Sequence, residues 1–393
     1  MRICIISAFE DSMQYDSGYS VRIINVAKGL MARGNSVSVI MPKYRASRRF
    51  VDEIPVYEMN GFCPKSLLKL IGKVANIAKP SALYFFDALF AVRSARFVEK
   101  ADIVQIEQPA LCILLSSFIR KTLKKAVAID CHDVFQALRL KHTGLVRRIL
   151  ETFLEKIALK NADLLITVSE KERDILLSMG FPSKKIIVAP NGVNTAFFAR
   201  PPDLQTIRSR YGFGDSRIVV FMGNLTYIPN QQAVKLISSI IAPKVRKEVN
   251  NAKFLVVGKN REEMKLRDIT FTGYVDNVAD VLAISDVGIA PLLEGAGTRL
   301  KILEYLSTGL PVVSTSVGAE GLVIENGYNI IIEDNIERFA YHIIQLLKND
   351  TLSSSMGEAG KVAAANYDWK KITDKLHEDY SCFFSKMSSK STA

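Results

Sequence analysis

The chain has 393 residues, of which 48% are hydrophobic, and a formal net charge of +12. This length exceeds what one compact core accommodates and fits two domains. The five cysteines are scattered and form no C-x-x-C pair, which disfavours a disulfide framework and indicates a reducing compartment. The apolar run at residues 3–8 is too short for a signal peptide. No stretch approaches the ~18 charge-free apolar residues of a membrane span, so we expect neither feature.

The first half of the chain predicts a parallel sheet. Short apolar runs alternate with helical patterns, and near-continuous apolar strands are typical of parallel sheets that helices cover on both faces. The expected strands are Ile3–Ser7, Val37–Met41, Ile103–Ile106, Val127–Asp130, Leu164–Val168 and Ile186–Ala189.

The second half repeats this alternation, and turn residues between Pro190 and Pro202 mark a boundary. We predict one Rossmann-like domain at 1–195, a second at 203–368, and a helix with a frayed tail at 369–393. Ligands of such sheets bind at the carboxyl ends of the strands. The expected strands of the second domain are Ile218–Met222, Phe254–Val257, Ile269–Thr272, Val287–Ala290, Val312–Thr315 and Ile330–Ile332.

The segment EGAGTRLKILEYLSTGLPVVSTSVGAEG (294–321) joins a glycine loop to a helix. The loop is Gly295 to Gly297, and the hydroxyl of Thr298 can cap the helix that follows. Leucines then recur at helical spacing until Gly309 and Pro311 end the helix. A glycine loop at a helix start presents free backbone amides and the positive end of the helix dipole, and therefore predicts a phosphate site.

Three charged side chains extend this phosphate site. Arg299 and Lys301 flank the amides at 297–300, including that of Leu300, and can pair with a phosphate. Glu304 lies one turn further, where its carboxylate can accept hydrogen bonds from ribose hydroxyls. Phosphate followed by ribose is the outline of a nucleoside diphosphate. Solvated side chains on an exposed helix are the alternative for all three.

The same segment resembles the donor-binding signature of glycosyltransferase family 4, which comprises retaining enzymes of the GT-B fold. Further segments extend the resemblance over nearly the whole chain. It implies an α/β protein with two doubly wound Rossmann-like domains facing across a cleft, the first binding the acceptor and the second the nucleotide sugar. The segments are ADLLITVSEKERDILLSMGF (162–181), KKIIVAPNGVN (184–194), GYVDNVADVLAISDVGIAPLLEGAG (273–297) and YDW (367–369).

The sequence departs from the family pattern at two places. The family has two glutamates eight positions apart, and the partner of Glu304 would fall at residue 296, which is alanine. Glu294 lies two positions earlier, and whether it replaces the missing carboxylate stays open. In GNLTYIPN (223–230), the family's diphosphate-binding Arg and Lys are replaced by Asn224, which follows Gly223, and by Pro229. A desolvated diphosphate needs cations, so we expect Arg299 and Lys301 to replace them.

Two residues of the first domain complete the predicted site. Gly18 lies between the first strand and a helix, where the resemblance places a loop beside the donor diphosphate. His132, in DCHD (130–133), matches a family histidine beside the donor sugar. An ordinary turn and a structural histidine are the alternatives. The crowded spacing of DCHD disfavours a metal site, and no D-x-D motif is present, so we expect neither an obligatory metal nor another cofactor.

The basic residues predict the kind of acceptor. Residues 1–200 hold 30 Lys and Arg against 18 Asp and Glu, whereas residues 201–393 hold 22 of each. The segment at 65–80 places Lys65, Lys69 and Lys73 on one helical face, which favours an anionic membrane or lipid-linked acceptor over nucleic acid. A solvated lysine surface is the alternative. Further basic segments are KYRASRR (43–49), RKTLKK (120–125) and RLKHTGLVRR (139–148).

The sequence therefore predicts a metal-independent, retaining glycosyltransferase of the hexosyltransferase type. It would move a sugar from a nucleotide diphosphate sugar to a hydroxyl of a glycan or lipid-linked acceptor of the cell envelope. We expect a cytoplasmic protein at the inner face of the membrane. The alternatives are a sugar-nucleotide epimerase or hydrolase with the same fold, and a non-catalytic sugar-binding protein.

Overall fold

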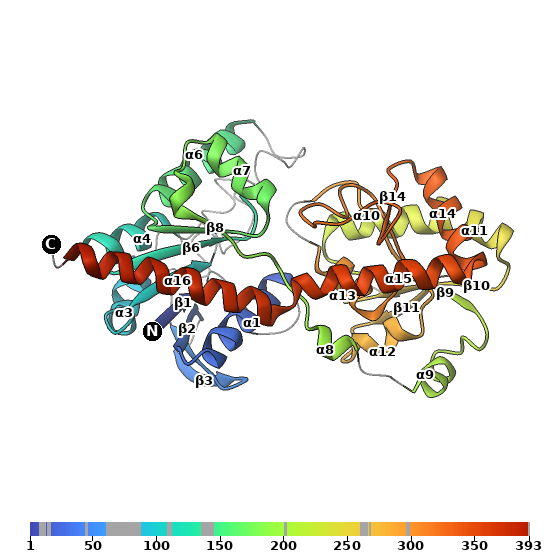
Figure 1. Cartoon of the computed structure of the whole chain (residues 1–393), viewed down its shortest axis with the longest axis horizontal. Helices are drawn as coiled ribbons and strands as arrows, with labels where there is room; N and C mark the ends of the chain where they lie inside the picture. Colours follow the sequence, from blue (N-terminus) through green and yellow to red (C-terminus); the bar gives the residue numbers. More distant parts are fainter. Residues whose placement is uncertain are drawn as a thin grey trace, which may run out of the picture. The chain divides into compact units, whose positions relative to one another are not determined.

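The structure of the chain is a computed structural model with two compact units, Met1–Pro190 with Trp369–Ala393, and Asn191–Asp368 (Figure 1). The chain thus leaves the first unit after Pro190 and returns to it at Trp369. The residues that the structure describes are 1–7, 13, 17–43, 46–59, 88–107, 112–134, 145–199, 203–259, 266, 269–295 and 299–391.

The first unit is built on an eight-stranded sheet with the order β3-β4-β2-β1-β5-β6-β7-β8. Neighbouring strands are parallel, except that β3 and β4 form an antiparallel hairpin. The strands are β1 (Arg2–Ile6), β2 (Ser36–Pro42), β3 (Ser47–Val51), β4 (Ile54–Met59), β5 (Ile103–Glu107), β6 (Ala126–Cys131), β7 (Leu164–Thr167) and β8 (Ile186–Val188).

The helices of the first unit include the C-terminal helix, which packs against the first helix of the chain. The helices are α1 (Gly18–Ala32), α3 (Ala88–Val98), α4 (Cys112–Lys121), α6 (Leu145–Lys160), α7 (Glu170–Ser178), the 3₁₀ turn η3 (Ser183–Lys185) and α16 (Trp369–Ser391).

The second unit has a fully parallel six-stranded sheet with the order β11-β10-β9-β12-β13-β14. Its strands are β9 (Arg217–Met222), β10 (Ala252–Val257), β11 (Ile269–Gly273), β12 (Val287–Ala290), β13 (Val312–Ser314) and β14 (Ile331–Ile332). Its helices are α8 (Thr195–Phe198), α9 (Leu204–Arg210), α10 (Ile228–Leu236), the π-helical turn η4 (Ile237–Ile241), α11 (Ala242–Glu248), α12 (Val278–Ala283), α13 (Leu300–Thr308), α14 (Ile336–Lys348), α15 (Asp350–Ala364) and the 3₁₀ turn η5 (Ala365–Tyr367).

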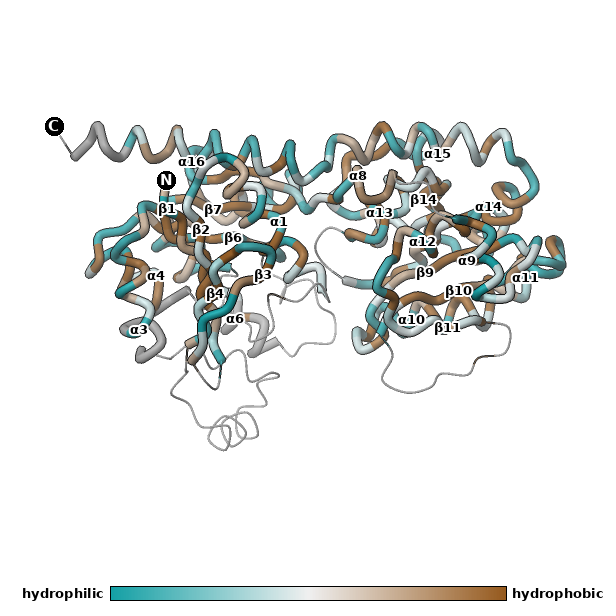
Figure 2. The backbone as a smooth tube through the Cα atoms, turned by 90° about the horizontal axis from the view of Figure 1, so that it is seen from below, coloured by the Kyte–Doolittle hydropathy of each residue, from teal (hydrophilic) through white to brown (hydrophobic). Residues whose placement is uncertain are grey.

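Alternate residues of the central strands pack into different hydrophobic clusters. In β9, Val219 and Phe221 belong to one cluster, and Ile218 and Val220 belong to another. Both faces of the sheet are therefore covered, which is why its strands read as continuous apolar runs rather than alternating ones. Figure 2 shows these hydrophobic strands inside each unit and hydrophilic residues along the outer helices α15 and α16.

The two parallel α/β units confirm the expected fold class, and every expected strand is present with ends within two residues. The β3–β4 hairpin was not expected. The turn between its strands uses Asp52 and Glu53, both with positive φ, although hairpin turns of this geometry favour Asn and Gly. Arg49 of β3 forms an ion pair with Glu58 of β4, so residues 47–49 of the basic segment KYRASRR (43–49) lie in an edge strand.

The start of α13 also differs from the expectation. Arg299, rather than Thr298, is its N-cap residue, and no side chain caps it. The helix ends as expected, because Gly309 adopts the left-handed conformation (φ 78°) that glycine permits. Thr298 and Gly297 lie outside the described residues.

Close packing of α1 against α16 generates a stability prediction. A Cβ atom at Gly29 would lie 2.2 Å from Oγ1 of Thr373 in α16. We expect Gly29→Ala to destabilise the protein by ~1–3 kcal/mol through overpacking, although alanine is the better helix former by ~1 kcal/mol. Urea unfolding measures this, with Ala32→Ser at the exposed end of α1 as the control. A Gly29→Ala protein as stable as the parent would contradict this account of the packing.

Candidate functional site

The carboxyl ends of β9 and β12 mark the candidate site of the second unit. These strands pair in parallel at the centre of the sheet, and the strand order reverses between them, since β10 and β11 lie beyond β9 and β13 and β14 lie beyond β12. Such a reversal leaves a crevice in which α/β sheets bind ligands. Gly223 and Asn224 directly follow β9, and Glu294 and Gly295 follow β12, so the predicted donor residues lie at this edge.

The backbone of the loop after β9 packs closely against a side chain of α10. A Cβ atom on Gly223 would lie 2.7 Å from the side chain of Asn230. Asn230 is buried in α10, and its Nδ2 donates to the carbonyl of Asn224 at 2.9 Å. The exposed side chain of Asn224 accepts the amide of Thr226 at 2.9 Å. Asn230 was not predicted, because its role depends on groups that only the fold brings together.

Lys301 points back over the sheet from the first turn of α13. Its Nζ donates to Oδ1 of Asn230 at 3.0 Å and lies 4.2 Å from the centre of the Phe221 ring. Burial, and then repulsion from Arg299, lowers the pKa of this ammonium to about 7, against the attraction of Glu304. We predicted a cation in the first turn of this helix. The structure has a partly buried ammonium there, whose charged form a bound anion would stabilise.

Glu304 follows Lys301 by three positions, so both side chains lie on one helical face. Burial raises the pKa of its carboxyl to about 7, while Lys301 opposes the shift. A carboxyl and an ammonium that both titrate near neutral pH, at the open edge of a sheet, are typical of a functional site.

The loop before α13 brings Arg299 against Gly295. Gly295 has φ 137°, and a Cβ atom there would lie 2.2 Å from Nη2 of Arg299. The backbone conformation therefore favours glycine at this position, and the flexible end of Arg299 occupies the space beside it. Glu294, Arg299 and Leu300, the first residue of α13, are all half-buried.

Tyr305 fixes α13 to the sheet. Its buried hydroxyl accepts the amide of Met222, the last residue of β9, at 2.7 Å. Its ring fills the space above Gly288 of β12, where a Cβ atom would lie 2.7 Å from the ring. One side chain thereby anchors the helix of Lys301 and Glu304 to both strands of the reversal. The local sequence indicates only that Tyr305 lies within a helix, and it does not reveal these contacts with the two strands.

His132 lies at the corresponding edge of the first unit. Glu107 ends β5, and His132 follows β6, the neighbouring strand. Oε2 of Glu107 is 2.6 Å from Nε2 of His132. Asp130 accepts two hydrogen bonds from the fully buried guanidinium of Arg22, each of 2.9 Å. His132 was predicted here, whereas Glu107 and Arg22 were not.

Gly18 is the exposed first residue of α1. It follows Ser17, whose side chain accepts the amide of Ser20 at 3.2 Å and caps the helix. The next residue, Tyr19, packs against His132 with the two rings tilted by 34° and 4.7 Å between the ring centres. The structure thus brings the glycine turn and His132 to the same edge of the first sheet.

Two family models match the chain at these units. The model described as Glycosyltransferase Family 4 matches residues 17–197, and the model described as Glycosyl transferases group 1 matches residues 216–349. The chain belongs to glycosyltransferase family 4. The resemblance drawn from the sequence is thereby confirmed.

Relatives and solved structures agree with this family. The phosphatidyl-myo-inositol mannosyltransferase of Mycolicibacterium smegmatis is 24% identical over 97% of this chain and 93% of its own length. The N-acetyl-alpha-D-glucosaminyl L-malate synthase of Bacillus anthracis is 29% identical over 53% of this chain and 56% of its own length. For several curated relatives, this synthase included, the match spans about half of the relative's length. HepE of Anabaena, solved with UDP and glucose, covers 97% of this chain and 99% of its own at 14% identity and a TM-score of 0.73. The GT-B fold is confirmed by this likeness.

The cluster around His132 offers three potential metal ligands. Among the described residues, Glu107, Asp130 and His132 place ligand atoms within 4.8 Å of one another. Asp130 is already bound by both arms of Arg22, and the guanidinium would repel a cation at that carboxylate. The donor set of this family member therefore fits a salt-bridged network better than a metal centre.

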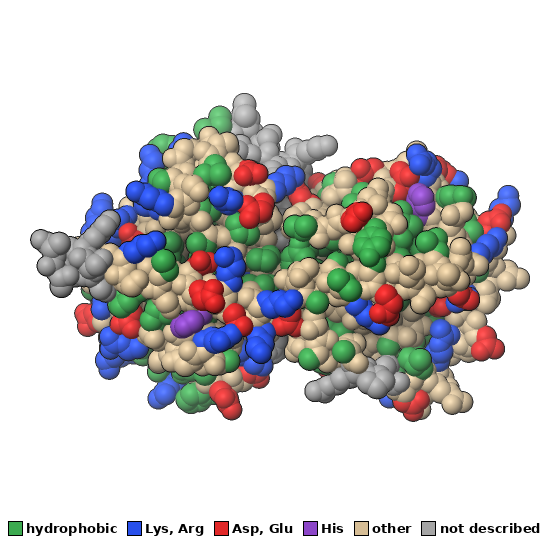
Figure 3. Space-filling model, viewed as in Figure 1, with side chains coloured by type: hydrophobic (Ala, Val, Ile, Leu, Met, Phe, Trp, Pro, Cys, Tyr) green, Lys and Arg blue, Asp and Glu red, His purple; other side chains and the backbone are tan. Residues whose placement is uncertain are grey.

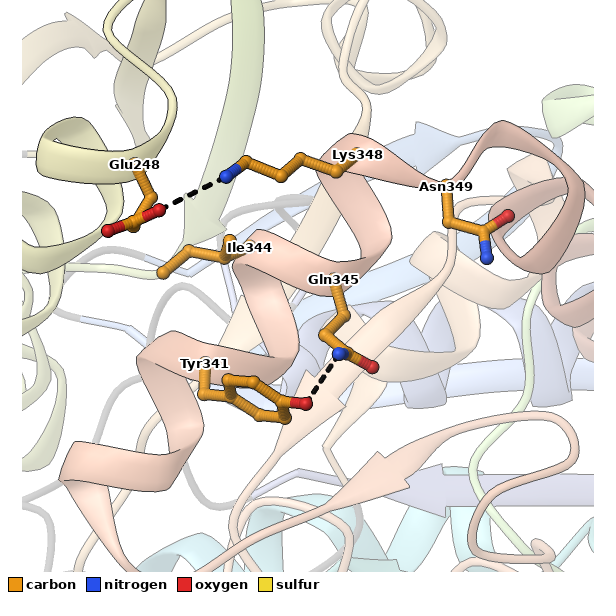
Figure 4. Close-up of a pocket in the computed structure, with 6 residues that line it drawn as sticks. All are labelled: Glu248, Tyr341, Ile344, Gln345, Lys348 and Asn349. Atoms are coloured by element: carbon orange, nitrogen blue, oxygen red, sulfur yellow. Dashed lines mark hydrogen bonds and ion pairs between the residues drawn. The ribbon is translucent and has the colours of Figure 1, made fainter.

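A shallow hollow of about 520 Å³ lies elsewhere in the second unit. Figure 4 shows its lining on α14 and the end of α11, with Glu248 and Lys348 paired at 3.1 Å and Gln345 bonded to Tyr341. None of the predicted donor residues lines it, so this hollow is not part of the predicted donor site.

The pKa of Glu304 generates a prediction on stability. Its folded value of about 7 lies above the unfolded value near 4.5, so the stability that it contributes below pH 4.5 is lost as pH rises through 7. A glutamine at this position does not ionise and has no such loss. We expect the stability of Glu304→Gln relative to the parent to improve by ~1–2 kcal/mol from pH 5 to pH 8, allowing for partial solvent screening.

Urea unfolding at the two pH values tests this expectation. Glu325→Gln, at an exposed glutamate of the same unit, is the matched control for the loss of a surface carboxyl. A difference between Glu304→Gln and the parent that does not change with pH would contradict the raised pKa of Glu304.

Proposed function

We propose that this protein is a retaining glycosyltransferase that moves a sugar from a nucleotide diphosphate sugar to a hydroxyl acceptor. The observation that carries the proposal is the set of Arg299, Lys301 and Glu304 at the carboxyl ends of β9 and β12. Two cations and one carboxyl, placed at a helix start beside the sheet's reversal, suit the phosphates and the ribose of a nucleotide.

In this proposal the cations stabilise the leaving group. The diphosphate gains negative charge as the glycosidic bond breaks, and fixed positive groups lower the energy of that state. Lys301 is desolvated and loses its proton near neutral pH without an anion, so a diphosphate would favour its charged form. Arg299 supplies a permanent charge, and the backbone amides of Arg299 and Leu300, at the start of α13, can add donors.

The proposed contribution of the first unit is His132, placed beside the donor sugar as the family resemblance implies. Closure of the two domains over the donor would exclude water and favour transfer over hydrolysis. We further propose that no metal is obligatory, because side-chain cations supply the charge that a metal would otherwise bring to the diphosphate.

The proposed acceptor is a lipid-linked or cell-envelope glycan. The relative from Mycolicibacterium smegmatis is named for a phosphatidylinositol acceptor, and the first half of this chain carries the whole basic excess. Part of that excess is used internally, because Arg49 pairs with Glu58, and Arg120 with Asp163 at 2.9 Å. Figure 3 shows Lys and Arg interspersed with Asp and Glu on the face drawn. The segment at 65–80 lies outside the described residues.

Donor binding has a direct test. In a panel of nucleoside diphosphates and their sugars, only a bound ligand raises the thermal midpoint. We expect Arg299→Ala and Lys301→Ala each to weaken the best ligand about 10–100-fold, as for the loss of a charge-assisted hydrogen bond. The double variant should lose less than the sum if both hold one diphosphate.

Asn224→Ala, at the same strand end but without a charge, is the matched control and should lose less. Full affinity in both alanine variants would place the diphosphate elsewhere. Product analysis with the best donor separates the alternatives, since an epimerase would interconvert the donor, a hydrolase would release free sugar, and a sugar-binding protein would do neither.

Membrane association is a separate prediction. Among the described helices, none is long and apolar enough to cross a bilayer. The basic excess of residues 1–200 is the reason for which we propose peripheral binding at the inner face of the membrane. Flotation with vesicles should increase with anionic lipid and decrease with salt. Glu in place of Lys65, Lys69 and Lys73 should release the protein from vesicles without changing nucleotide affinity. An absence of flotation at low salt would remove the membrane from the proposal and leave sugar transfer untouched.

A further inference from the structure

A chain of buried hydrogen bonds joins the C-terminal helix to His132. The hydroxyl of Tyr380 in α16 donates to Oε1 of Gln105 in β5 at 2.6 Å. Nε2 of Gln105 donates to Oε1 of Glu107, also at 2.6 Å. The second oxygen of Glu107 meets Nε2 of His132. Tyr380, Gln105 and Glu107 are fully buried, and His132 is 8% exposed, so these bonds are shielded from bulk solvent.

The chemistry of Gln105 fixes the direction of this chain. Its amide nitrogen faces two carboxylates, Glu107 and, at 3.3 Å, Asp130. A flipped amide would turn its oxygen toward both carboxylates, which is electrostatically unfavourable. The amide oxygen therefore faces Tyr380, whose hydroxyl must act as the donor. Each side chain thus has one role, and the arrangement cannot reverse without leaving a buried group unsatisfied.

The charges of the cluster leave one proton between Glu107 and His132. Asp130 is neutralised by the bidentate contact with Arg22. Burial, and then Asp130, raises the pKa of Glu107, while the histidine and the guanidinium lower it. With Asp130 paired to Arg22, the carboxylate of Glu107 faces two donors, the amide of Gln105 and Nε2–H of His132. The 2.6 Å contact places this one proton between Glu107 and the neutral ring.

We propose that Glu107 is a positioning residue that fixes the tautomer and the ring orientation of His132, and that Tyr380 of α16 holds Glu107 through Gln105. A role of Glu107 in holding His132 beside the donor sugar rests on the proposed function. The tautomer of His132 does not, because it depends only on contacts within the first unit. With Nε2 directed to Glu107, Nδ1 is the nitrogen that carries the lone pair in the neutral ring.

The test combines a spectroscopic readout with kinetics on the full-length protein. The chain has only four histidines, so labelled histidine gives a spectrum that His132→Gln assigns. At pH 8, long-range ¹H–¹⁵N correlations should show the Nε2–H tautomer for His132. Glu107→Gln should populate the Nδ1–H tautomer as well, because the new amide can also donate to Nε2. This variant adds no uncompensated buried charge, since Arg22 and Asp130 still balance.

The kinetic expectation separates positioning from binding. Glu107→Gln should lower turnover at least about tenfold, as when the carboxylate behind a catalytic histidine is replaced. Tyr380→Phe keeps the ring and removes one donor; it should shift the His132 resonances and lower turnover about 3–10-fold. Affinity for the nucleoside diphosphate, which binds to the other unit in this account, should stay unchanged in both. Tyr341→Phe, an exposed tyrosine of α14, is the matched control.

The outcomes are distinguishable. Parent-like His132 spectra in both Glu107→Gln and Tyr380→Phe would overturn the inference. An altered tautomer with full turnover would overturn the positioning role. If Glu107→Gln fails to fold, Tyr380→Phe decides alone by the same two readouts. A parent protein that transfers no sugar would contradict the proposed function, while the spectra would still test the hydrogen-bonded chain.

Discussion

Where the connections of a parallel sheet reverse direction, two neighbouring strand ends face a crevice that no crossover covers. Both units of this chain have such a reversal, between β1 and β5 in the first and between β9 and β12 in the second. Glu107 ends a strand of the first reversal, and Gly223 and Gly295 follow the strands of the second. The chemistry proposed for this protein thus lies where the topology leaves polar groups room for a ligand.

Each of these edges holds charged groups that are partly or fully buried, and the two units compensate them in different ways. In the first, Arg22 compensates Asp130 and also donates to the carbonyl of Pro190 at 3.1 Å, where the chain leaves the unit. Paired charges and buried hydrogen bonds hold that network together. In the second, Lys301 and Glu304 remain only partly compensated, with pKa values displaced toward 7. These partly compensated groups make the empty site less stable. An anionic ligand would stabilise the ammonium of Lys301.

The sequence predicted those parts of the fold that depend on local pattern. Continuous apolar runs located the strands, and Gly309 located the end of α13, because each signal acts within a few residues. The edge hairpin was missed, since the residues of β3 are largely exposed and carry charges that pair across strands. Asn230, Tyr305 and Glu107 were also missed. The contacts that place them in the sites, with Lys301, Met222 and His132, span 25 to 83 residues of sequence, and no local pattern encodes such contacts.

The proposed donor chemistry depends most directly on Lys301 as an ammonium that a diphosphate restores. Calorimetric titration with the best nucleoside diphosphate at pH 8, in two buffers of different ionisation enthalpy, measures the protons bound with the ligand. Because the pKa of Lys301 in the empty site is about 7, the parent protein should take up close to one proton on binding, and Lys301→Met should take up none. Binding without proton uptake, or equal uptake by the variant, would contradict the account.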